Sequence, residues 1–273
     1  MNLTYRELIL WLKETLNGRE NLDHEVRWLI EAFSGREFLS IGADEAVPRV
    51  SVYRRAAERL KRHEPFQYVV GSQEFYGHLF LVNESVLVPR PETELLAEKA
   101  IQWGRGRRLK ALDLCTGSGC IAISLAKELD GDFLATDISE AALATAKKNN
   151  ELNGTDVTFR YSDLFFHLPK GERFDLITAN PPYLTQKEMR EIPLEVTYEP
   201  FIALDGGPTG LFAIERIMKE VADRLGEKGL FLMEIGENQG ETALSLAAKY
   251  GLAGAVTERD LNGKDRFLRW EKP

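Results

Sequence analysis

A chain of 273 residues is long enough for one large domain and a smaller one, since domains average roughly 150 residues. Its composition, 44% hydrophobic and 29% charged, is that of a globular protein with a sizeable core and excludes disordered, collagen-like and fibrous chains. The net charge of −8 disfavours a protein whose main task is to bind nucleic acid, because phosphate binding relies on clustered Lys and Arg. The chain has neither a long apolar run nor a signal-like N-terminus, so we expect a cytoplasmic protein that does not cross a membrane.

Residues 1–73 carry apolar side chains at helical spacing, which predicts a small helical bundle. The face of the first helix is expected to consist of Tyr5, Leu8, Leu12 and Leu16. Helix ends are predicted at Asn17–Gly18 and Gly35, which tolerate a left-handed backbone, and Pro65 is expected to stop the third helix. The bundle lacks a cluster of His, Cys or paired carboxylates, so we expect it to recognise a substrate rather than to carry chemistry.

A basic segment interrupts the acidic balance of the chain. Residues 49–62 contain six Lys and Arg residues against one Glu. Two interpretations fit this pattern: a solvated helix face, or a surface that docks on RNA or on an acidic protein. The sequence leaves both open.

The spacing of apolar residues changes at residues 74–88, where short apolar runs alternate with turn-forming residues. We predict strands over 74–76 and 79–82 on either side of a turn at Gly77–His78, and a further short strand over 86–88. This segment is interpreted as a β-hairpin that links the helical bundle to the rest of the chain.

Residues 89–273 alternate between strand-like and helix-like runs. Strands are predicted over 109–114, 133–136, 157–161, 174–179 and 230–235, and helices over 121–129, 140–152 and 211–225. Such alternation predicts a parallel sheet covered on both faces. Asn262–Gly263 between two further strand-like runs predicts an antiparallel hairpin at the sheet edge. The fold class is therefore expected to be α/β, with a Rossmann-like sheet that ends in an antiparallel hairpin, plus the N-terminal helical bundle.

A glycine-rich loop, Asp113 to Cys120, joins the first strand of this sheet to its first helix. Glycines there allow a sharp turn and close approach to a ligand, and the free amides of a helix N-terminus attract negative groups. Asp137 ends the next strand, 18 residues after Gly119 (137 − 119), where a carboxylate can accept hydrogen bonds from both hydroxyls of a ribose. The two cysteines lie too close together, without partner histidines, to indicate a disulfide framework or a metal site, so we expect reduced thiols.

The loop is not the dinucleotide fingerprint, because Ala122 stands where the third glycine is required. It resembles the Asp/Glu-x-Gly-x-Gly-x-Gly motif of class I methyltransferases, with Cys115 in place of the first glycine. The resemblance implies S-adenosylmethionine as the cofactor, S-adenosylhomocysteine as the product and no metal. The expected cofactor contacts are Asp113, Cys115, Thr116, Gly117, Ser118, Gly119, Asp137, Asp163, Leu164 and Asn180.

The segment Asn180-Pro181-Pro182-Tyr183 follows the strand at 174–179 and is the most informative motif. The Asn180 side-chain oxygen and the Pro181 carbonyl can each accept one hydrogen of a planar NH₂ group, and Pro182 stiffens the chain between them. Tyr183 is expected to supply a flat wall against the acceptor. We predict that Asn180, Pro181 and Tyr183 are catalytic and that all four residues contact the substrate.

Several motifs together resemble the HemK/PrmC family of release-factor glutamine methyltransferases. They are Val88 to Glu94 (Val-Pro-Arg-Pro-Glu-Thr-Glu), the glycine loop, Asn180 to Tyr183 and Glu234-Ile235-Gly236. The resemblance implies methylation of the side-chain amide of the glutamine in the Gly-Gly-Gln motif of class I peptide chain release factors. It also implies domains at 1–73 for substrate recognition, 74–88 for the linking hairpin and 89–273 for methyl transfer. Leu164 departs from the tryptophan that some members of the family have at this position.

Two other functions are considered. A methyltransferase acting on exocyclic amino groups of DNA or RNA bases would use the same Asn-Pro-Pro-Tyr segment, but the acidic charge balance disfavours a nucleic-acid substrate. A catalytically inactive adaptor that binds proteins would not need the intact Asn180 and glycine loop. By itself, Arg90 is interpreted as a structural residue that pairs with a carboxylate, next to a helix start at Pro91–Glu92.

Overall fold

The structure is a computed structural model that describes residues 3–273. The chain divides into two compact units. One unit holds the described residues up to Ser72 together with Pro193–Tyr198, and the other holds Gln73–Ile192 and Glu199–Pro273. Within the described range, every helix is too short or too polar to cross a bilayer.

The first unit is a helical bundle, as predicted. Its helices are α1 (Tyr5–Thr15), α2 (Leu22–Ser34), the short 3₁₀ turn η1 (Phe38–Ser40), α3 (Val50–Lys61) and α4 (Phe66–Val70). Thr4 and Glu7 form a capping box that starts α1, and the predicted face of this helix is buried. Gly35 ends α2 in the left-handed conformation, as expected.

The third helix, α3, ends at Lys61, before Pro65 as predicted. Pro65 also has a second position that the sequence did not indicate, as the N-cap residue of α4. Proline suits this place because the first turn of a helix has no use for the missing N–H. The unit also includes the 3₁₀ turn η3 (Val196–Tyr198), which no sequence pattern indicated. Arg19 Nη2 donates to Glu195 Oε1 at 3.1 Å, and this bond ties the segment to the bundle.

A two-stranded hairpin follows along the chain, made of β1 (Ser72–Phe75) and β2 (His78–Leu81). The turn lies at Tyr76 and Gly77, one residue before the predicted Gly77–His78. Both residues have positive φ, which suits a tight two-residue turn between strands with a right-handed twist. The strand predicted over 86–88 was wrong. Val86 N–H closes a turn onto Asn83, and Val88 N–H donates to the Glu199 carboxylate rather than to a strand.

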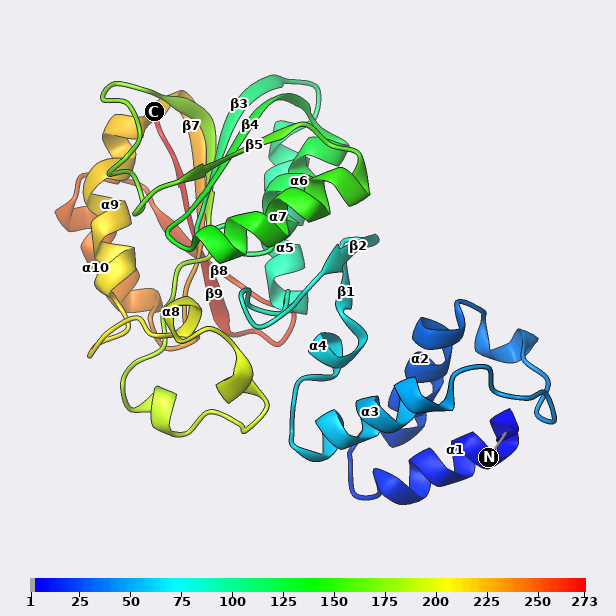
Figure 1. Cartoon of the computed structure of the whole chain (residues 1–273). Coiled ribbons are helices and arrows are strands. Elements are labelled where there is room, and N and C mark those ends of the chain that lie inside the picture. The colour runs from blue at the N-terminus through cyan, green and yellow to red at the C-terminus, as the bar shows by residue number, and fades with distance from the viewer. Residues whose placement is uncertain (1–2) are drawn as a thin grey trace. The chain divides into compact units, whose positions relative to one another are not determined.

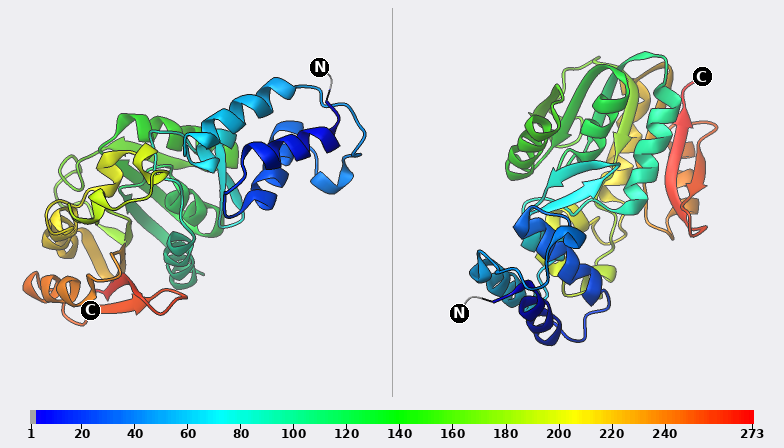
Figure 2. Two further views of the ribbon diagram at one scale, coloured as in Figure 1. Left: turned by 90° about the horizontal axis from the view of Figure 1, so that it is seen from below. Right: turned by 90° about the vertical axis from the view of Figure 1, so that its right-hand side faces the viewer.

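The second unit is built on a seven-stranded sheet in the order β5-β4-β3-β6-β7-β9-β8. The five strands from β5 to β7 are parallel, and β9 and β8 continue the sheet antiparallel, so the predicted fold class is confirmed. Figure 2 shows the C-terminal strands, in red, along one edge. The strands are β3 (Arg108–Leu114), β4 (Asp130–Asp137), β5 (Val157–Tyr161), β6 (Phe174–Ala179), β7 (Leu225–Glu234), β8 (Val256–Arg259) and β9 (Asp265–Glu271).

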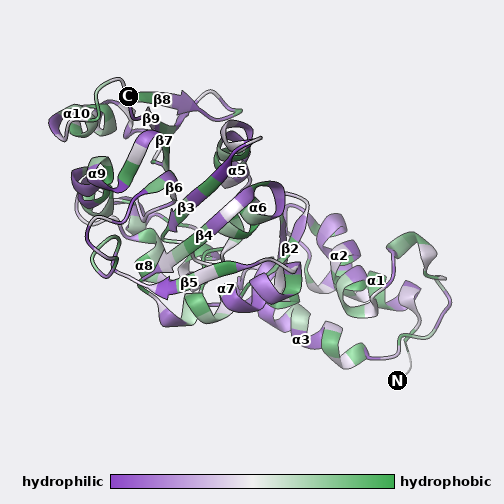
Figure 3. Cartoon of the chain, turned by 90° about the horizontal axis from the view of Figure 1, so that it is seen from above, coloured by the Kyte–Doolittle hydropathy of each residue, from purple (hydrophilic) through white to green (hydrophobic). Residues whose placement is uncertain are grey.

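Helices cover both faces of this sheet (Figure 1). One face carries α5 (Pro91–Gly104), α6 (Cys120–Glu128) and α7 (Glu140–Asn153), and the other carries α9 (Phe212–Arg224) and α10 (Gly240–Lys249). Figure 3 shows hydrophobic residues along the central strands, where each face of the sheet forms an apolar core with its helices. Pro91 occupies the first turn of α5, as its sequence position indicates.

The topology brings four loops together. Strands β3, β4, β5 and β6 are parallel, so their carboxyl ends, at Leu114, Asp137, Tyr161 and Ala179, lie at one edge of the sheet. The chain runs outward from β3 to β4 and β5 and then returns to place β6 on the other side of β3. A crevice opens where the strand order reverses in this way, and it is the usual ligand site of such sheets.

Candidate active site

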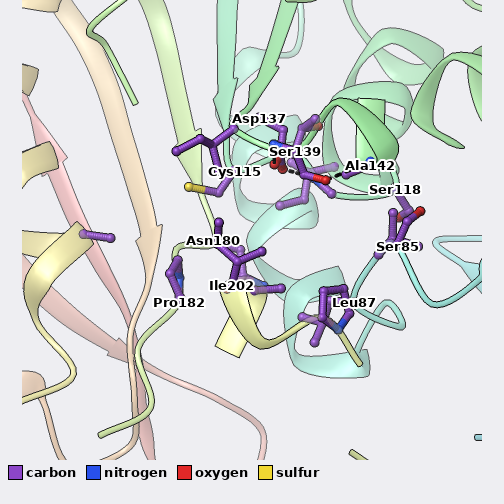
Figure 4. A pocket seen from close by; sticks show the side chains of 18 of the residues that line it. Ser85, Leu87, Cys115, Ser118, Asp137, Ser139, Ala142, Asn180, Pro182 and Ile202 are labelled. Carbon is purple, nitrogen blue, oxygen red and sulfur yellow. Dashed lines mark hydrogen bonds between the residues drawn. The ribbon is translucent and has the colours of Figure 1, made fainter. Parts of the chain in front are cut away.

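A cavity of about 310 Å³ lies at this reversal of strand order and is large enough for a small ligand. Its wall is formed by the loops after β3, β4, β5 and β6, by the segment 85–93 and by residues 200–216. Figure 4 shows side chains from these separate segments arranged around the same space, among them Cys115, Asp137 and Asn180.

The glycine loop forms one wall of the cavity. Gly117 and Gly119 have positive φ, of 54° and 81°, which explains the need for glycine at both positions. A Cβ atom on Gly119 would also lie 3.0 Å from Ile123 Cδ1 and 3.2 Å from Ala146 Cβ. Cys115 adopts a φ of 57° and borders the cavity, so a non-glycine residue holds the left-handed conformation there.

Asp113 lies beneath the loop rather than at the cavity surface. Its carboxylate accepts hydrogen bonds from Thr116 Oγ1 at 2.6 Å and from Thr178 Oγ1 at 2.8 Å, which joins the loop to β6. Burial raises the pKa of Asp113 to about 7. The described cavity wall includes neither Asp113 nor Gly119, so the structure gives both residues the task of shaping the loop.

Asp137 ends β4 with its carboxylate at the cavity. Oδ2 accepts the N–H of Gly117 and Oδ1 accepts the N–H of Ser139, both at 2.9 Å. Each carboxylate oxygen can accept a second hydrogen bond, so the group can still receive two hydroxyls from a ligand in the cavity. Burial raises the pKa of Asp137 above its usual value. This anchored acceptor, beside the backbone of the glycine loop, fits the ribose of a nucleoside cofactor.

Asp163 and Leu164 border the cavity after β5. Asp163 Oδ2 accepts a hydrogen bond from Arg216 Nη2 at 2.8 Å, so an ion pair lies at this end of the site. Arg216 also stands over the ring of Phe212, 5.5 Å from its centre, and both residues border the cavity. Sequence reasoning missed Arg216 and Phe212, because their helix carries them to the site only in the folded chain.

The Asn-Pro-Pro-Tyr segment lies opposite the glycine loop, and its members take different positions. Asn180 and Pro182 border the cavity, whereas Pro181 is buried and, like Tyr183, is absent from the described cavity wall. Tyr183 Oη donates to Glu234 Oε1 at 3.1 Å, and Tyr183 packs against the core of the sheet. The flat wall that we expected from Tyr183 is therefore not part of the cavity surface in this structure.

Hydrogen bonds to Thr93, which also lines the cavity, and from Thr93 to Glu234 hold the Asn180 side chain in place. Asn180 Nδ2 donates to Thr93 Oγ1 at 3.2 Å, and Thr93 Oγ1 donates to Glu234 Oε2 at 2.8 Å. Both residues belong to sequence motifs noted above, to which no specific role was assigned. Only the tertiary structure shows that the two motifs meet.

Arg90, which lines the cavity, forms a further ion pair. Arg90 Nη2 donates to Glu199 Oε1, so Arg90 pairs with a carboxylate as interpreted from the sequence. Glu199 is buried and also accepts the N–H of Val88 at 3.3 Å. Burial raises the pKa of Glu199, and the nearby Arg90 acts in the opposite direction. The pair ties the segment before α5 to the segment before α8 (Phe201–Leu204).

Comparisons with known proteins agree with this fold. The family described as "Methyltransferase small domain" matches residues 91–199. A methyltransferase structure from Pyrococcus furiosus superposes with a TM-score of 0.55 at 20% identity, over 80% of this chain and 98% of that one. A SAM-dependent methyltransferase from Agrobacterium tumefaciens gives a TM-score of 0.51 at 17% identity, over 74% of this chain and 70% of that one. At these identities the structural similarity establishes the fold alone.

Proteins matched by sequence are more similar to this chain than these structures are. The chain is 36% identical to the release factor glutamine methyltransferase of Geobacter sulfurreducens, over 97% of this chain and 95% of that protein. It is 36% identical to the protein of the same name from Bacillus subtilis, over 97% of this chain and 96% of that protein. The corresponding protein of Koribacter versatilis is 44% identical over 81% of this chain and 79% of that one. At this identity and coverage, the chain belongs to the family of release factor glutamine methyltransferases.

Proposed function

We propose that the protein transfers a methyl group from S-adenosylmethionine to the side-chain amide nitrogen of the glutamine in the Gly-Gly-Gln motif of class I peptide chain release factors. Membership of the family supports the reaction type and the release-factor substrate. The observation that carries the proposal is Asn180: it borders the cavity while its amide nitrogen is engaged by Thr93. Because release factors act on ribosomes, the reaction would take place in the cytoplasm.

The glycine-loop side of the cavity is suited to the cofactor. Residues 115–118 would approach it with backbone, Asp137 would accept hydrogen bonds from the ribose hydroxyls, and Asp163 with Leu164 would flank the adenine. When bound, the cofactor supplies a methyl group on a positively charged sulfonium. Asp137 is itself partly buried, which limits the competition of water for these hydrogen bonds.

The Asn180 side of the cavity is suited to a planar NH₂ group. The Asn180 oxygen would accept one hydrogen of the substrate amide. The Pro181 backbone carbonyl would accept the other, although Pro181 does not line the described cavity. With both hydrogens engaged, the nitrogen lone pair is directed toward the methyl donor. Pro182 keeps the two acceptors at a fixed separation, because its ring restricts the backbone of the residue before it.

This arrangement addresses the low reactivity of an amide. The amide nitrogen shares its lone pair with the carbonyl, the resonance behind a rotation barrier of roughly 18–20 kcal/mol. Holding the nucleophile in line with the methyl group can remove about 7–11 kcal/mol of the barrier. A preorganised partner for the developing positive charge adds on the order of 3 kcal/mol. The methylated nitrogen becomes acidic and can lose its proton after transfer, so the proposal requires no general base.

The helical bundle is proposed to recognise the substrate, as residues 1–73, with the hairpin at 74–88 as linker and residues 89–273 as the methyltransferase domain. Exposed side chains of the bundle support this role. Trp28 is half exposed and packs against His24 and Phe66, and the basic residues of α3 include exposed Arg54 and Arg55. Exposed aromatic and arginine side chains are enriched in protein-binding surfaces.

The proposal is tested by incubating the purified protein with labelled S-adenosylmethionine and a class I release factor. The matched control is the same release factor with its Gly-Gly-Gln glutamine replaced by alanine. We expect label on the unaltered release factor alone. Equal labelling of the two substrates would contradict the proposed acceptor.

The same assay includes DNA and transfer RNA as competing substrates. The relatives that establish the family are named for a protein substrate, and none of these names supports the nucleic-acid alternative. We therefore expect no label on either nucleic acid. Label on a nucleic acid in place of the release factor would replace the proposed substrate with an exocyclic amino group of a base.

A further inference from the structure

We infer that Glu234 and Thr93 are positioning residues that fix which end of the Asn180 side-chain amide faces the substrate. This inference rests on the proposed methylation of a glutamine amide and adds two residues to it. Glu234 sets the direction of the hydrogen bonds, Thr93 transmits it, and Asn180 presents its oxygen to the cavity.

The three residues come from distant parts of the chain and meet at the cavity, where Thr93 and Asn180 both line the wall and Glu234 is buried. Thr93 lies in the first turn of α5, Glu234 is the last residue of β7, and Asn180 directly follows β6. Their side chains form a continuous series, with Asn180 Nδ2 at 3.2 Å from Thr93 Oγ1 and Thr93 Oγ1 at 2.8 Å from Glu234 Oε2. Tyr183 Oη reaches the other carboxylate oxygen at 3.1 Å.

The direction of these bonds follows from the chemistry of the groups. An ionised carboxylate can only accept hydrogen bonds, so Thr93 must donate its single hydroxyl hydrogen to Glu234. The Thr93 oxygen is then left as an acceptor, and Asn180 must turn its NH₂ end toward it. The carbonyl end of the Asn180 amide therefore faces away from Thr93. Rotating the amide by half a turn would place two acceptors together at Thr93 and would present NH₂ to the NH₂ of the substrate.

Burial enforces this orientation of the Asn180 amide. The exposed fraction of Glu234 is 1% and that of Thr93 is 2%, so water does not replace a missing partner. Burial raises the pKa of Glu234, whereas the Thr93 hydroxyl, the Arg266 guanidinium and the Tyr183 hydroxyl act in the opposite direction. Glu234 also receives the hydroxyl of Tyr183, so one carboxylate holds both ends of the Asn180–Tyr183 segment.

The decisive variant is Thr93→Val, which keeps the branched shape of the side chain and removes the hydroxyl. We expect the kcat for release-factor labelling to fall about 10- to 100-fold, in the range seen when a supporting group behind a reacting residue is lost. The Kd for S-adenosylmethionine should stay within about threefold, because the donor half of the cavity is untouched. Thr93→Ser, which keeps the hydroxyl, should restore kcat to within about threefold of the wild type. A Thr93→Val enzyme with wild-type kcat, or an equal loss in Thr93→Ser, would overturn the inference.

Two further variants distinguish an effect of hydrogen-bond direction from an effect of altered side-chain packing. Glu234→Gln keeps the size of the side chain but adds a donor, so it should lower kcat about as much as Thr93→Val. Ser124→Ala is the control for loss of a buried helical hydroxyl, because Ser124 Oγ has no hydrogen-bond partner among residues 3–273. We expect Ser124→Ala to keep the wild-type kcat. A wild-type kcat in Glu234→Gln would contradict the positioning role of the Glu234 carboxylate, even if the Thr93 variants support the role of Thr93.

A double-mutant cycle tests the coupling directly. If Thr93 acts through Asn180, then Thr93→Val added to Asn180→Ala should change the labelling rate by less than about twofold. Independent, multiplicative losses would show that Thr93 acts by another route and would overturn the inference. The wild-type reaction is measured first: absence of label on the glutamine refutes the proposed function, whereas wild-type labelling that is insensitive to Thr93→Val refutes only the positioning role.

Discussion

The backbone N–H of Gly117 donates to Asp137 Oδ2 at 2.9 Å, so the glycine loop after β3 and the acidic residue at the end of β4 form one structural unit. The loop borders the cavity and the carboxylate faces the same space. Because the bond fixes the carboxylate before any ligand arrives, the ribose acceptor is preorganised. The two motifs of the cofactor half therefore depend on each other.

The first prediction concerns Asp137→Asn. The asparagine keeps the size of the side chain but has one acceptor oxygen in place of two, so it cannot serve Gly117, Ser139 and a ribose together. Hydrogen bonds to charged groups contribute about 1.5–3 kcal/mol each, so we expect the Kd for S-adenosylmethionine to rise about 10- to 100-fold. Isothermal titration calorimetry measures this Kd. Asp132→Asn, on the same strand but exposed, is the control, and a Kd for Asp137→Asn equal to that of Asp132→Asn would contradict the assignment.

The second prediction concerns the pH dependence of stability through Asp113. Burial raises the pKa of this carboxyl from 3.8 to about 7, so the folded protein keeps a proton that the unfolded chain has lost. The contribution of Asp113 to the free energy of unfolding is therefore largest below pH 3.8 and declines as the pH rises toward 7. The slope is at most about 1.36 kcal/mol per pH unit.

Asp113→Asn removes this titration and nearly preserves the shape of the side chain. Urea unfolding of both proteins at pH 5, 6, 7 and 8 gives the test. We expect the stability advantage of the wild type over Asp113→Asn to shrink from about pH 5 to about pH 7 and to level off above. An advantage that stays constant over this range would show that Asp113 ionises normally in the folded protein.

The third prediction uses the left-handed backbone of Cys115. Cys115→Gly relieves the strain and Cys115→Val increases it, because a β-branched residue fits this conformation poorly. Both variants remove the same thiol, so the loss of the sulfur does not contribute to the difference between them. We expect Cys115→Val to be less stable than Cys115→Gly by about 2 kcal/mol in urea unfolding. Equal stability would contradict the conformation found for Cys115.

Much of the sheet could be predicted from the sequence. The strands at 157–161 and 174–179 were predicted with the bounds that the structure shows, because short apolar runs between turn residues leave little choice. Helix α10 was not predicted. Its buried residues include the small Ala243 and Ala247, which give a weak apolar pattern, and its packing is decided by the sheet beneath it.

The site was predictable only in part. The loops bearing Asp137 and Asn180 could be placed at one edge of the sheet, because parallel strands align their carboxyl ends. The bonds from Asn180 to Thr93 and from Thr93 to Glu234 span 87 and 141 residues of sequence, and no local pattern predicts them. The roles proposed for the cofactor and substrate residues remain predictions, which the variants above test.

The most direct test of the account is the labelling rate of Asn180→Ala on a class I release factor, measured together with its affinity for S-adenosylmethionine. We predict a labelling rate at least about 100-fold below the wild type with a Kd for the cofactor within about threefold, because the variant removes a preorganised acceptor and leaves the donor half intact. Asn262→Ala, in the exposed C-terminal hairpin, should keep the wild-type rate. A near-normal labelling rate in Asn180→Ala would contradict the claim that this side chain orients the glutamine amide toward the methyl donor.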